Sequence, residues 1–153
     1  MTTLERAIRS AVEAHEGHKD KAGAPYILHP LRVMLRMDSE TERIAAVLHD
    51  VIEDTRWTAD DLRKEGFSED VVTVVVCLTR KKEVDPLTGK KKKETYDEFI
   101  DRVLVNPTAR RVKLADLEDN MDMRRIEKPT TEDWKRLKKY HGAWLKLRDR
   151  KDQ

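Results

Sequence analysis

Residues 48–55 (LHDVIEDT) concentrate side chains that can do chemistry in a short segment. They hold one imidazole and three carboxylates, from His49, Asp50, Glu53 and Asp54, and no lysine or arginine. Neighbouring carboxylates repel one another, and a bound cation relieves that repulsion. Neutral imidazole and carboxylate oxygens are ligands for divalent metals. The segment therefore predicts a metal site or, alternatively, the solvated side of a helix whose apolar residues collect on the opposite side.

A metal bound here needs ligands from elsewhere, because one helix face offers only two adjacent donors. His29 directly precedes Pro30, which suits the first position of a helix and would leave His29 in an extended conformation. Asp116 lies on an apolar-flanked stripe of its own helix, where a carboxylate is costly to bury unless it is paired or ligates a metal. Two simpler interpretations stay open: a structural histidine at position 29, and an ion pair between Asp116 and Lys113.

The elements that must position these residues are predicted to be helices. Apolar spacing, capping residues and helix stops predict them over residues 4–17, 31–38, 39–55, 58–65, 69–80, 96–105, 107–123 and 130–149. The valine-rich segment after Ser68 suits a strand as well, but its length and its neighbours favour a helix. Residues 80–94 contain Pro86 and Gly89 without apolar periodicity, which predicts a loop. The chain is therefore expected to be all-α, with about eight helices in one domain over residues 1–153.

Composition argues against several classes of protein. The 32 basic and 30 acidic residues leave a net charge of +2, so no global field favours nucleic acid and any attraction for phosphates must be local. The one cysteine, Cys77, excludes an internal disulfide and fits a reducing compartment. No signal peptide and no apolar run of about 20 residues is visible. We expect a cytoplasmic protein with no membrane or nucleic-acid partner, and the sequence does not indicate its oligomeric state.

Three segments resemble, in order, the motifs of the HD-domain metal-dependent phosphohydrolases. They are AHEGHKDKAGAPYILHPLRV, HDVIEDT and VKLADLEDNM, and the resemblance covers nearly the whole chain. The nearest branch is the hydrolase domain of the RelA/SpoT group, which includes the small alarmone hydrolases and the animal Mesh1 type. The resemblance implies an HD-domain helical bundle. It also implies hydrolysis of the 3′-pyrophosphate of guanosine tetra- or pentaphosphate, which gives pyrophosphate and GDP or GTP.

The resemblance further implies one divalent metal ion, usually Mn²⁺, while Zn²⁺, Fe²⁺ and Mg²⁺ stay open. Its implied ligands are His29, His49, Asp50 and Asp116. Glu53 and Asp54 are implied to be catalytic residues beside the reaction centre. Each lies four residues beyond an implied ligand, which on a helix places it on the same face one turn further. Which of the two is the base and which the acid does not follow from the sequence.

The implied substrate contacts are less complete. Lys21 matches a phosphate contact and Asn120 a ribose contact. Arg136 and Tyr140 match a phosphate and sugar pair, although an exposed helix face explains their spacing equally well. Asp20 stands where the family has an arginine that packs on the base, so the base preference is in doubt. An acid at this position could instead accept hydrogen bonds from a base or ribose.

Two further features bear on the substrate. Lys92 and Lys93 belong to a run of four lysines, which is either a solvated loop or a surface that holds or steers an anionic nucleotide. Leu117 and Asp119 replace an arginine and a histidine of the family motif. Two rival functions therefore stay open: a phosphohydrolase of another nucleotide, including NADPH or an adenine alarmone, and a catalytically inactive nucleotide sensor.

Overall fold

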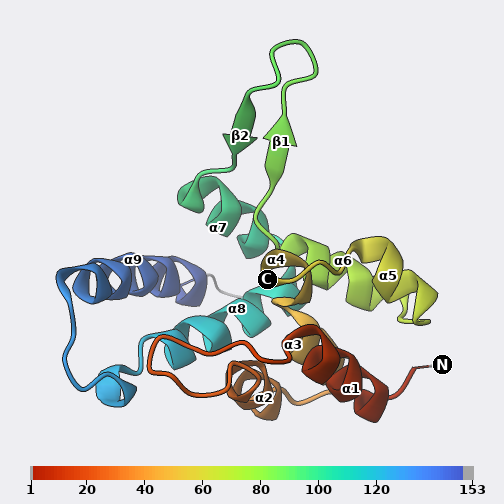
Figure 1. Cartoon of the computed structure of the whole chain (residues 1–153), viewed down its shortest axis with the longest axis horizontal. Coiled ribbons are helices and arrows are strands. Elements are labelled where there is room, and N and C mark those ends of the chain that lie inside the picture. Colours follow the sequence, from red (N-terminus) through yellow and green to blue (C-terminus); the bar gives the residue numbers. More distant parts are fainter. Residues whose placement is uncertain (1, 150–153) are drawn as a thin grey trace.

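The computed structural model of the chain describes residues 2–149, which are built almost entirely from α-helices (Figure 1). The helices are α1 (Leu4–Ala14), α2 (Leu28–Leu35), α3 (Glu40–Leu48), α4 (Val51–Asp54), α5 (Ala59–Lys64), α6 (Glu69–Cys77), α7 (Tyr96–Leu104), α8 (Pro107–Asn120), the short 3-10 helix η1 (Met123–Arg125) and α9 (Thr131–Arg148). The predicted all-α class is confirmed, including a helix in the valine-rich segment. Within residues 2–149, none of the helices has the length and apolar character needed to cross a membrane. That the chain is one domain stays a prediction.

Helix α3 packs against α1, α2, α6 and α8 and carries the centre of the core. Residues 44–48 of this helix, IAAVL, are all buried, so the helix is covered on every side. Its start is set by the predicted capping box, in which the Ser39 hydroxyl accepts from the Glu42 N–H and the Glu42 carboxylate accepts from the Ser39 N–H. This rigid helix ends at the residues that the sequence singled out.

The predicted continuous helix over residues 39–55 is wrong, because the chain turns at His49 and Asp50 between α3 and α4. The Nδ1 of His49 lies 2.6 Å from the Ala46 carbonyl oxygen, and the His49 backbone N–H also donates to that oxygen. A side chain that occupies a helix carbonyl competes with the backbone ladder, which explains why the helix stops here. The turn aims both side chains into the body of the protein.

The predicted start of the second helix is also wrong. Helix α2 begins at Leu28 rather than at Pro30, so His29 is helical and not extended. The N–H groups of Leu28 and His29 donate to the carbonyls of Pro25 and Tyr26 and form the first turn. Pro30 therefore lies where a missing N–H costs nothing, because the first helical N–H groups need no partner within the helix.

The predicted loop over residues 80–94 is instead an antiparallel hairpin of β1 (Lys82–Val84) and β2 (Lys91–Lys93), which stands out from the helices (Figure 1). Residues 81–93 are all exposed, so the hairpin shows no apolar alternation from which strands could be predicted. Arg102 on α7 anchors its base, because its guanidinium donates to the Cys77 and Thr79 carbonyls and to the Glu94 carboxylate.

Candidate metal centre and active site

Four side chains from three parts of the chain converge in the middle of the helical body. They are His29 on α2, His49 and Asp50 in the turn after α3, and Asp116 on α8. One ligand atom from each lies within 4.8 Å of all the others. The His29 Nε2 is 3.0 Å from Asp116 Oδ1, and the His49 Nε2 is 3.1 Å from Asp50 Oδ2. The two imidazoles and Asp116 are at most 4% exposed, so this cluster is shielded from solvent.

The donor set fits a divalent metal ion. In each histidine the Nδ1 is already engaged, by Asp119 at 2.6 Å from His29 and by the Ala46 carbonyl at 2.6 Å from His49. Such partners fix the tautomer and leave the Nε2 lone pairs aimed at the carboxylates. The buried His49 Nε2 has no hydrogen-bond partner in the described chain. A bound cation would satisfy it, so the cluster can hold a metal ion.

The electrostatics of the cluster point the same way. Burial opposes charge on His49, yet Asp50 and Asp116 raise its pKa to about 9. Burial likewise opposes charge on the carboxylates, yet His49 lowers the pKa of Asp50, and Lys113 lowers that of Asp116. The carboxylates thus favour positive charge between them, and a divalent ion supplies it in place of protons on the histidines. The Lys113–Asp116 ion pair, at 2.7 Å, accompanies the cluster rather than replacing it.

The two acids on α4 lie beside the cluster. The Glu53 carboxylate accepts from the backbone N–H of Arg80 at 2.8 Å, which ties it to the base of the hairpin. Asp54 lies 3.3 Å from the hydroxyl of Tyr26, which also donates to Asp50. Desolvation and the charge of Asp50 raise the pKa of Asp54 to about 6. Asp54 can therefore carry or release a proton near neutral pH.

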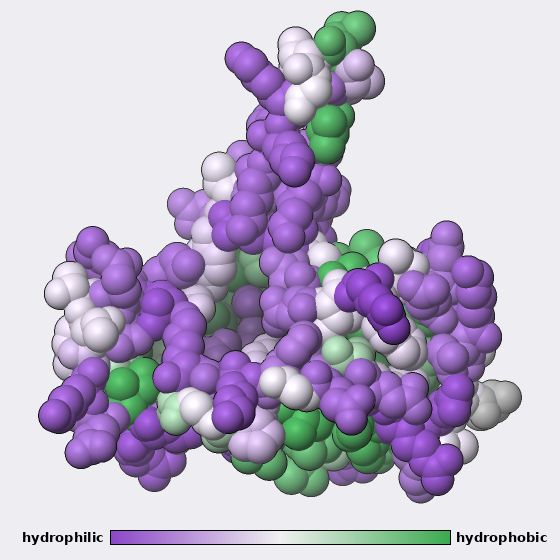
Figure 2. Space-filling model, viewed as in Figure 1, coloured by the Kyte–Doolittle hydropathy of each residue, from purple (hydrophilic) through white to green (hydrophobic). Residues whose placement is uncertain are grey.

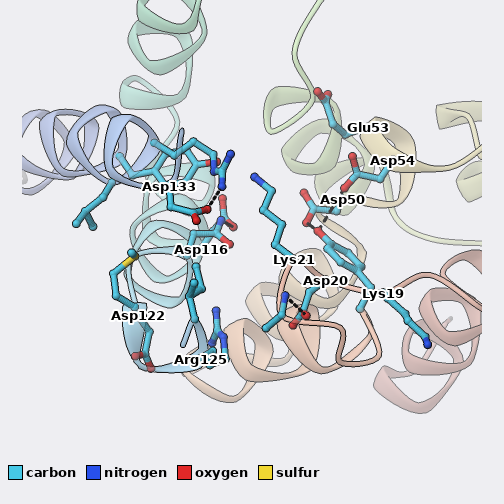
Figure 3. Close-up of a pocket in the computed structure, with 18 of the residues that line it drawn as sticks. Lys19, Asp20, Lys21, Asp50, Glu53, Asp54, Asp116, Asp122, Arg125 and Asp133 are labelled. Atoms are coloured by element: carbon cyan, nitrogen blue, oxygen red, sulfur yellow. Dashed lines mark hydrogen bonds and ion pairs between the residues drawn. The ribbon is translucent and has the colours of Figure 1, made fainter. Parts of the chain in front are cut away.

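A cavity of about 430 Å³ joins this cluster to most of the predicted substrate contacts (Figure 3). Lys21 extends into it between the wall with Asp116 and the wall with Asp50 (Figure 3). The predicted contacts that line it are Asp20, Lys21, Asn120, Arg136 and Tyr140. The structure thus places cations and hydrogen-bonding groups beside the metal-ligand cluster.

Three of the predicted substrate residues are not placed as their expected roles suggested. Asp20 lines the cavity, but its Oδ1 accepts from the backbone N–H groups of Ala22 and Ala24 at 2.9 Å and shapes its own loop. Lys92 and Lys93 lie in β2 and do not line the cavity. They are exposed on the hairpin, outside the set of side chains that surround the cluster.

Sequence reasoning missed several residues of the site. Tyr26 stands three residues before His29 in PYILHP, a spacing that on a helical turn could have indicated it. Asp119 was visible only as a departure from a motif, yet it receives hydrogen bonds from His29, Arg32 and Arg125. Arg125 lines the cavity from η1, and nothing in its local sequence signals this.

Comparison with known proteins agrees with this arrangement. The family model described as HD domain matches residues 7–151. A guanosine-3′,5′-bis(diphosphate) 3′-pyrophosphohydrolase of Aquifex aeolicus is 35% identical over 156 residues, with 92% of this chain and 22% of the relative covered. A GTP pyrophosphokinase of Streptomyces coelicolor is 37% identical over 123 residues, with 77% and 14% covered.

A solved structure is also similar. It is described as a metazoan ortholog of SpoT that hydrolyses ppGpp, and it superposes with a TM-score of 0.76 at 25% identity, covering 97% of this chain and 87% of its own. The chain spans less than a quarter of the length of the two curated relatives named above. Since the family model matches nearly the whole sequence, the chain belongs to the HD-domain family.

Proposed function

We propose that this chain hydrolyses the 3′-pyrophosphate of ppGpp or pppGpp and releases pyrophosphate with GDP or GTP. The observation that carries the proposal is one cavity lined by two members of the four-ligand cluster, Asp50 and Asp116. The acids of α4 and the cations of Lys21 and Arg136 line the same cavity. A pyrophosphate group carries several negative charges. When it leaves water and binds in a cavity, cationic side chains or a metal ion must compensate those charges. The relatives named as ppGpp hydrolases support the same substrate class.

The ligands that we assign to the metal are His29, His49, Asp50 and Asp116. Their mixed nitrogen and oxygen donors accept Mn²⁺ as well as Fe²⁺ or Zn²⁺, and we propose Mn²⁺ because the family resemblance implies it. Such an ion supplies Lewis-acid activation of water and of a phosphate oxygen. The remaining steps fall to side chains of the protein.

Hydrolysis forms a bond from a water oxygen to the phosphorus on the 3′ oxygen and breaks the bond between that phosphorus and the 3′ oxygen. One proton of the water must leave, and the departing 3′ oxygen must gain one. Asp54, with its raised pKa, and Glu53, held by the Arg80 N–H, are the groups that we assign to these transfers. Lys21 and Arg136 would hold the phosphates, and Tyr140 and Asn120 the sugar.

Departures from the family motifs favour a second candidate, hydrolysis of another nucleotide. Asp20, Asp119 and Asp122 stand where the resemblance implies two arginines and a histidine. We propose an adenine alarmone or NADPH as the alternative substrate of the same metal site. A small nucleotide of either kind would be met in the cytoplasm, the location that we propose.

One assay separates these functions. The full chain is incubated with Mn²⁺ and separately with ppGpp, pppGpp, pppApp, NADPH and common nucleotides, and the products are identified by mass. The proposal predicts metal-dependent formation of pyrophosphate and GDP from ppGpp. Turnover of another nucleotide alone would favour the second candidate. Metal-loaded protein that converts none of them would be a sensor.

The ligand assignment has its own test, independent of turnover. Asp116→Asn should weaken Mn²⁺ binding and abolish hydrolysis while keeping the shape of the buried side chain near Lys113. Circular dichroism would verify the fold. Unchanged Mn²⁺ affinity would show that the assignment is wrong.

A further inference from the structure

The hairpin of β1 and β2 does not line the cavity, and every residue of its two strands is exposed. It projects from the helical body beyond α7 (Figure 1). Its shaft is covered with hydrophilic residues, and hydrophobic residues appear toward its tip (Figure 2). Burial of apolar side chains contributes little to the stability of so exposed a segment, so packing against the core does not explain its choice of residues.

One face of the hairpin carries positive charge without compensation. The register places Lys82 opposite Lys93 and Val84 opposite Lys91. Because side chains alternate along a strand, these four lie on one face. That face has three ammonium groups and no carboxylate, and none of these lysines forms an ion pair within residues 2–149. Like charges directly opposite each other destabilise a strand pair, so this arrangement weakens the hairpin unless an anion binds.

A further cation lies close to this face, on the neighbouring helix α9. Burial and surrounding cations, Lys93 among them, lower the pKa of Lys139 on α9. On the opposite face of the ribbon Lys92 lies across from Glu83, the one local acid in the strand ladder. The cations therefore form a strip on one side rather than an even mixture of charges.

The tip of the hairpin is a well-bonded turn with an apolar apex. The Asp85 carboxylate accepts from the backbone N–H of Leu87 at 2.7 Å and of Thr88 at 3.2 Å. Gly89, with a φ of 68°, donates its N–H to the Asp85 carbonyl at 2.8 Å. This turn holds Leu87 at the apex, where it is 94% exposed. The leucine is thus presented outward by a defined structure rather than by a loose loop.

We propose that the lysine face of this hairpin binds the phosphate backbone of nucleic acid. Lys91 and Lys93, two residues apart on one strand, are spaced by roughly 7 Å along the ribbon, so that they can contact successive phosphates. A two-stranded ribbon fits the major groove of duplex DNA. The local strip supplies the attraction that the net charge of +2 does not.

An anionic membrane is the less suitable partner for the same lysines. Insertion of Leu87 would carry the adjacent Asp85 to the anionic headgroups, and hydrogen bonds from the Leu87 and Thr88 N–H groups lower the pKa of Asp85 and keep it charged. Val84 and Leu87 alone offer little apolar area for anchoring. Nucleic acid that contacts the lysine face of the ribbon requires no insertion of Leu87, so Asp85 can stay in solvent.

The test measures binding of the full chain to fluorescent 20-base-pair DNA and RNA duplexes by anisotropy, at salt concentrations from 50 to 200 mM. Engagement of the three lysines of this face, at positions 82, 91 and 93, predicts a slope of log K against log salt of about −3. Lys82→Glu/Lys91→Glu should reduce the affinity at least 10-fold and flatten the slope by about 2. These exchanges relieve repulsion within the hairpin, so unfolding cannot account for the loss.

The matched control, Lys64→Glu/Lys128→Glu, makes the same change in net charge at exposed lysines outside the hairpin and should leave most of the affinity intact. Absence of binding to both duplexes at 50 mM salt would overturn the proposal, as would equal losses in the two double variants. Binding to anionic vesicles but not to duplexes would overturn it in favour of a membrane. A lowered kcat/KM for the nucleotide substrate, with no duplex bound, would mean that the lysines steer that substrate instead.

Discussion

The Nδ1 of His29 lies 2.6 Å from the Oδ2 of Asp119, and the same carboxylate accepts hydrogen bonds from Arg32 and Arg125. One buried acid therefore connects a candidate metal ligand to a wall of the cavity. A carboxylate behind a ligating imidazole fixes its tautomer and raises its basicity. Burial opposes charge on Asp119, yet His29 and Arg32 lower its pKa, so the carboxylate is ionised at neutral pH.

Asp119→Asn is predicted to weaken Mn²⁺ binding by about 10- to 100-fold, because it removes the negative charge behind His29 but keeps the side-chain shape. Titration of Mn²⁺ followed by electron paramagnetic resonance would measure this. Asp122→Asn is the control, since Asp122 pairs with Arg124 away from the ligand cluster and should leave the affinity nearly unchanged. An unaltered affinity in Asp119→Asn would show that this carboxylate does not support a metal ligand.

Glu53→Gln and Asp54→Asn are each predicted to lower kcat by roughly 100-fold or more, the usual scale for a lost acid–base group. Both should retain Mn²⁺ affinity and the melting temperature, because neither belongs to the ligand cluster. Single-turnover hydrolysis of ppGpp measures the effect, and the exposed Asp60→Asn serves as control. Wild-type turnover in both variants would show that these acids are not catalytic and only form the polar face of a helix.

The family resemblance implied that His29, His49, Asp50 and Asp116 ligate one metal ion, and the structure brings these four side chains together. Residue chemistry alone left a structural histidine and a simple ion pair open, and metal binding by the four residues stays a prediction. The turn at His49 could not be predicted, because it depends on a ring nitrogen that meets the Ala46 carbonyl. Periodicity describes backbone preference and burial, not a competing side-chain hydrogen bond.

Contacts between distant segments could not be predicted from the sequence either. The hairpin escaped prediction because both of its faces are exposed, so no alternation of apolar residues marks it. Asp119 appeared only as a loss relative to a motif, and its role depends on His29 and Arg32, which lie about ninety residues earlier. Residues that act through partners from distant segments leave no local pattern in the sequence.

His15 predicts how stability changes with pH. Its side chain is 2% exposed, its ring nitrogens have no hydrogen-bond partner in residues 2–149, and burial lowers its pKa from 6.5 to about 4. The unfolded chain therefore binds this proton at a higher pH than the folded protein does. This contribution of His15 to stability is fully present above about pH 6.5 and is lost as the pH falls toward 4.

Between pH 7 and pH 5, His15 alone should cost about 2 kcal/mol of unfolding free energy, from roughly 1.4 kcal/mol per unit of pKa difference. Urea unfolding of the parent and of His15→Leu at both pH values measures this contribution as the difference between their pH dependences, because other groups, His49 among them, also titrate in this range. His15→Leu should remove most of that dependence, whereas the exposed His141→Gln should preserve it. The same pH dependence in His15→Leu and in the parent would mean that His15 is not buried as a neutral group.

Arg102 is predicted to hold the hairpin in place. Its guanidinium donates to the carbonyls of Cys77 and Thr79 at 2.8 Å and pairs with Glu94, which is 9% exposed. Arg102→Ala leaves these acceptors unpaired and should cost about 2–3 kcal/mol in urea unfolding. Arg63→Ala breaks only exposed ion pairs and should change the unfolding free energy far less. Equal costs would contradict the anchoring role.

Base preference gives the last prediction, and it rests on the proposed function. Asp20 shapes its own loop, so it does not take the place of the base-packing arginine that the family resemblance implies. Arg125 lines the same cavity, and hydrogen bonds to the side chain and carbonyl of Asp119, at 3.2 and 2.8 Å, hold its guanidinium. In Figure 3 both Asp20 and Arg125 lie at the end of the cavity away from Glu53. A planar guanidinium fixed in this way can stack on a purine.

Arg125→Ala should therefore raise KM for ppGpp by about 10-fold, corresponding to 1–2 kcal/mol of stacking, with kcat changed by less than about 3-fold. The ratio of kcat/KM for guanine over adenine alarmones should fall. Asp20→Ala is the matched comparison, because a loosened Lys21 loop should raise KM for both nucleotides equally. If Arg125→Ala lowers kcat and leaves KM and the base ratio unchanged, Arg125 acts through Asp119 on the metal ligands and not on the base.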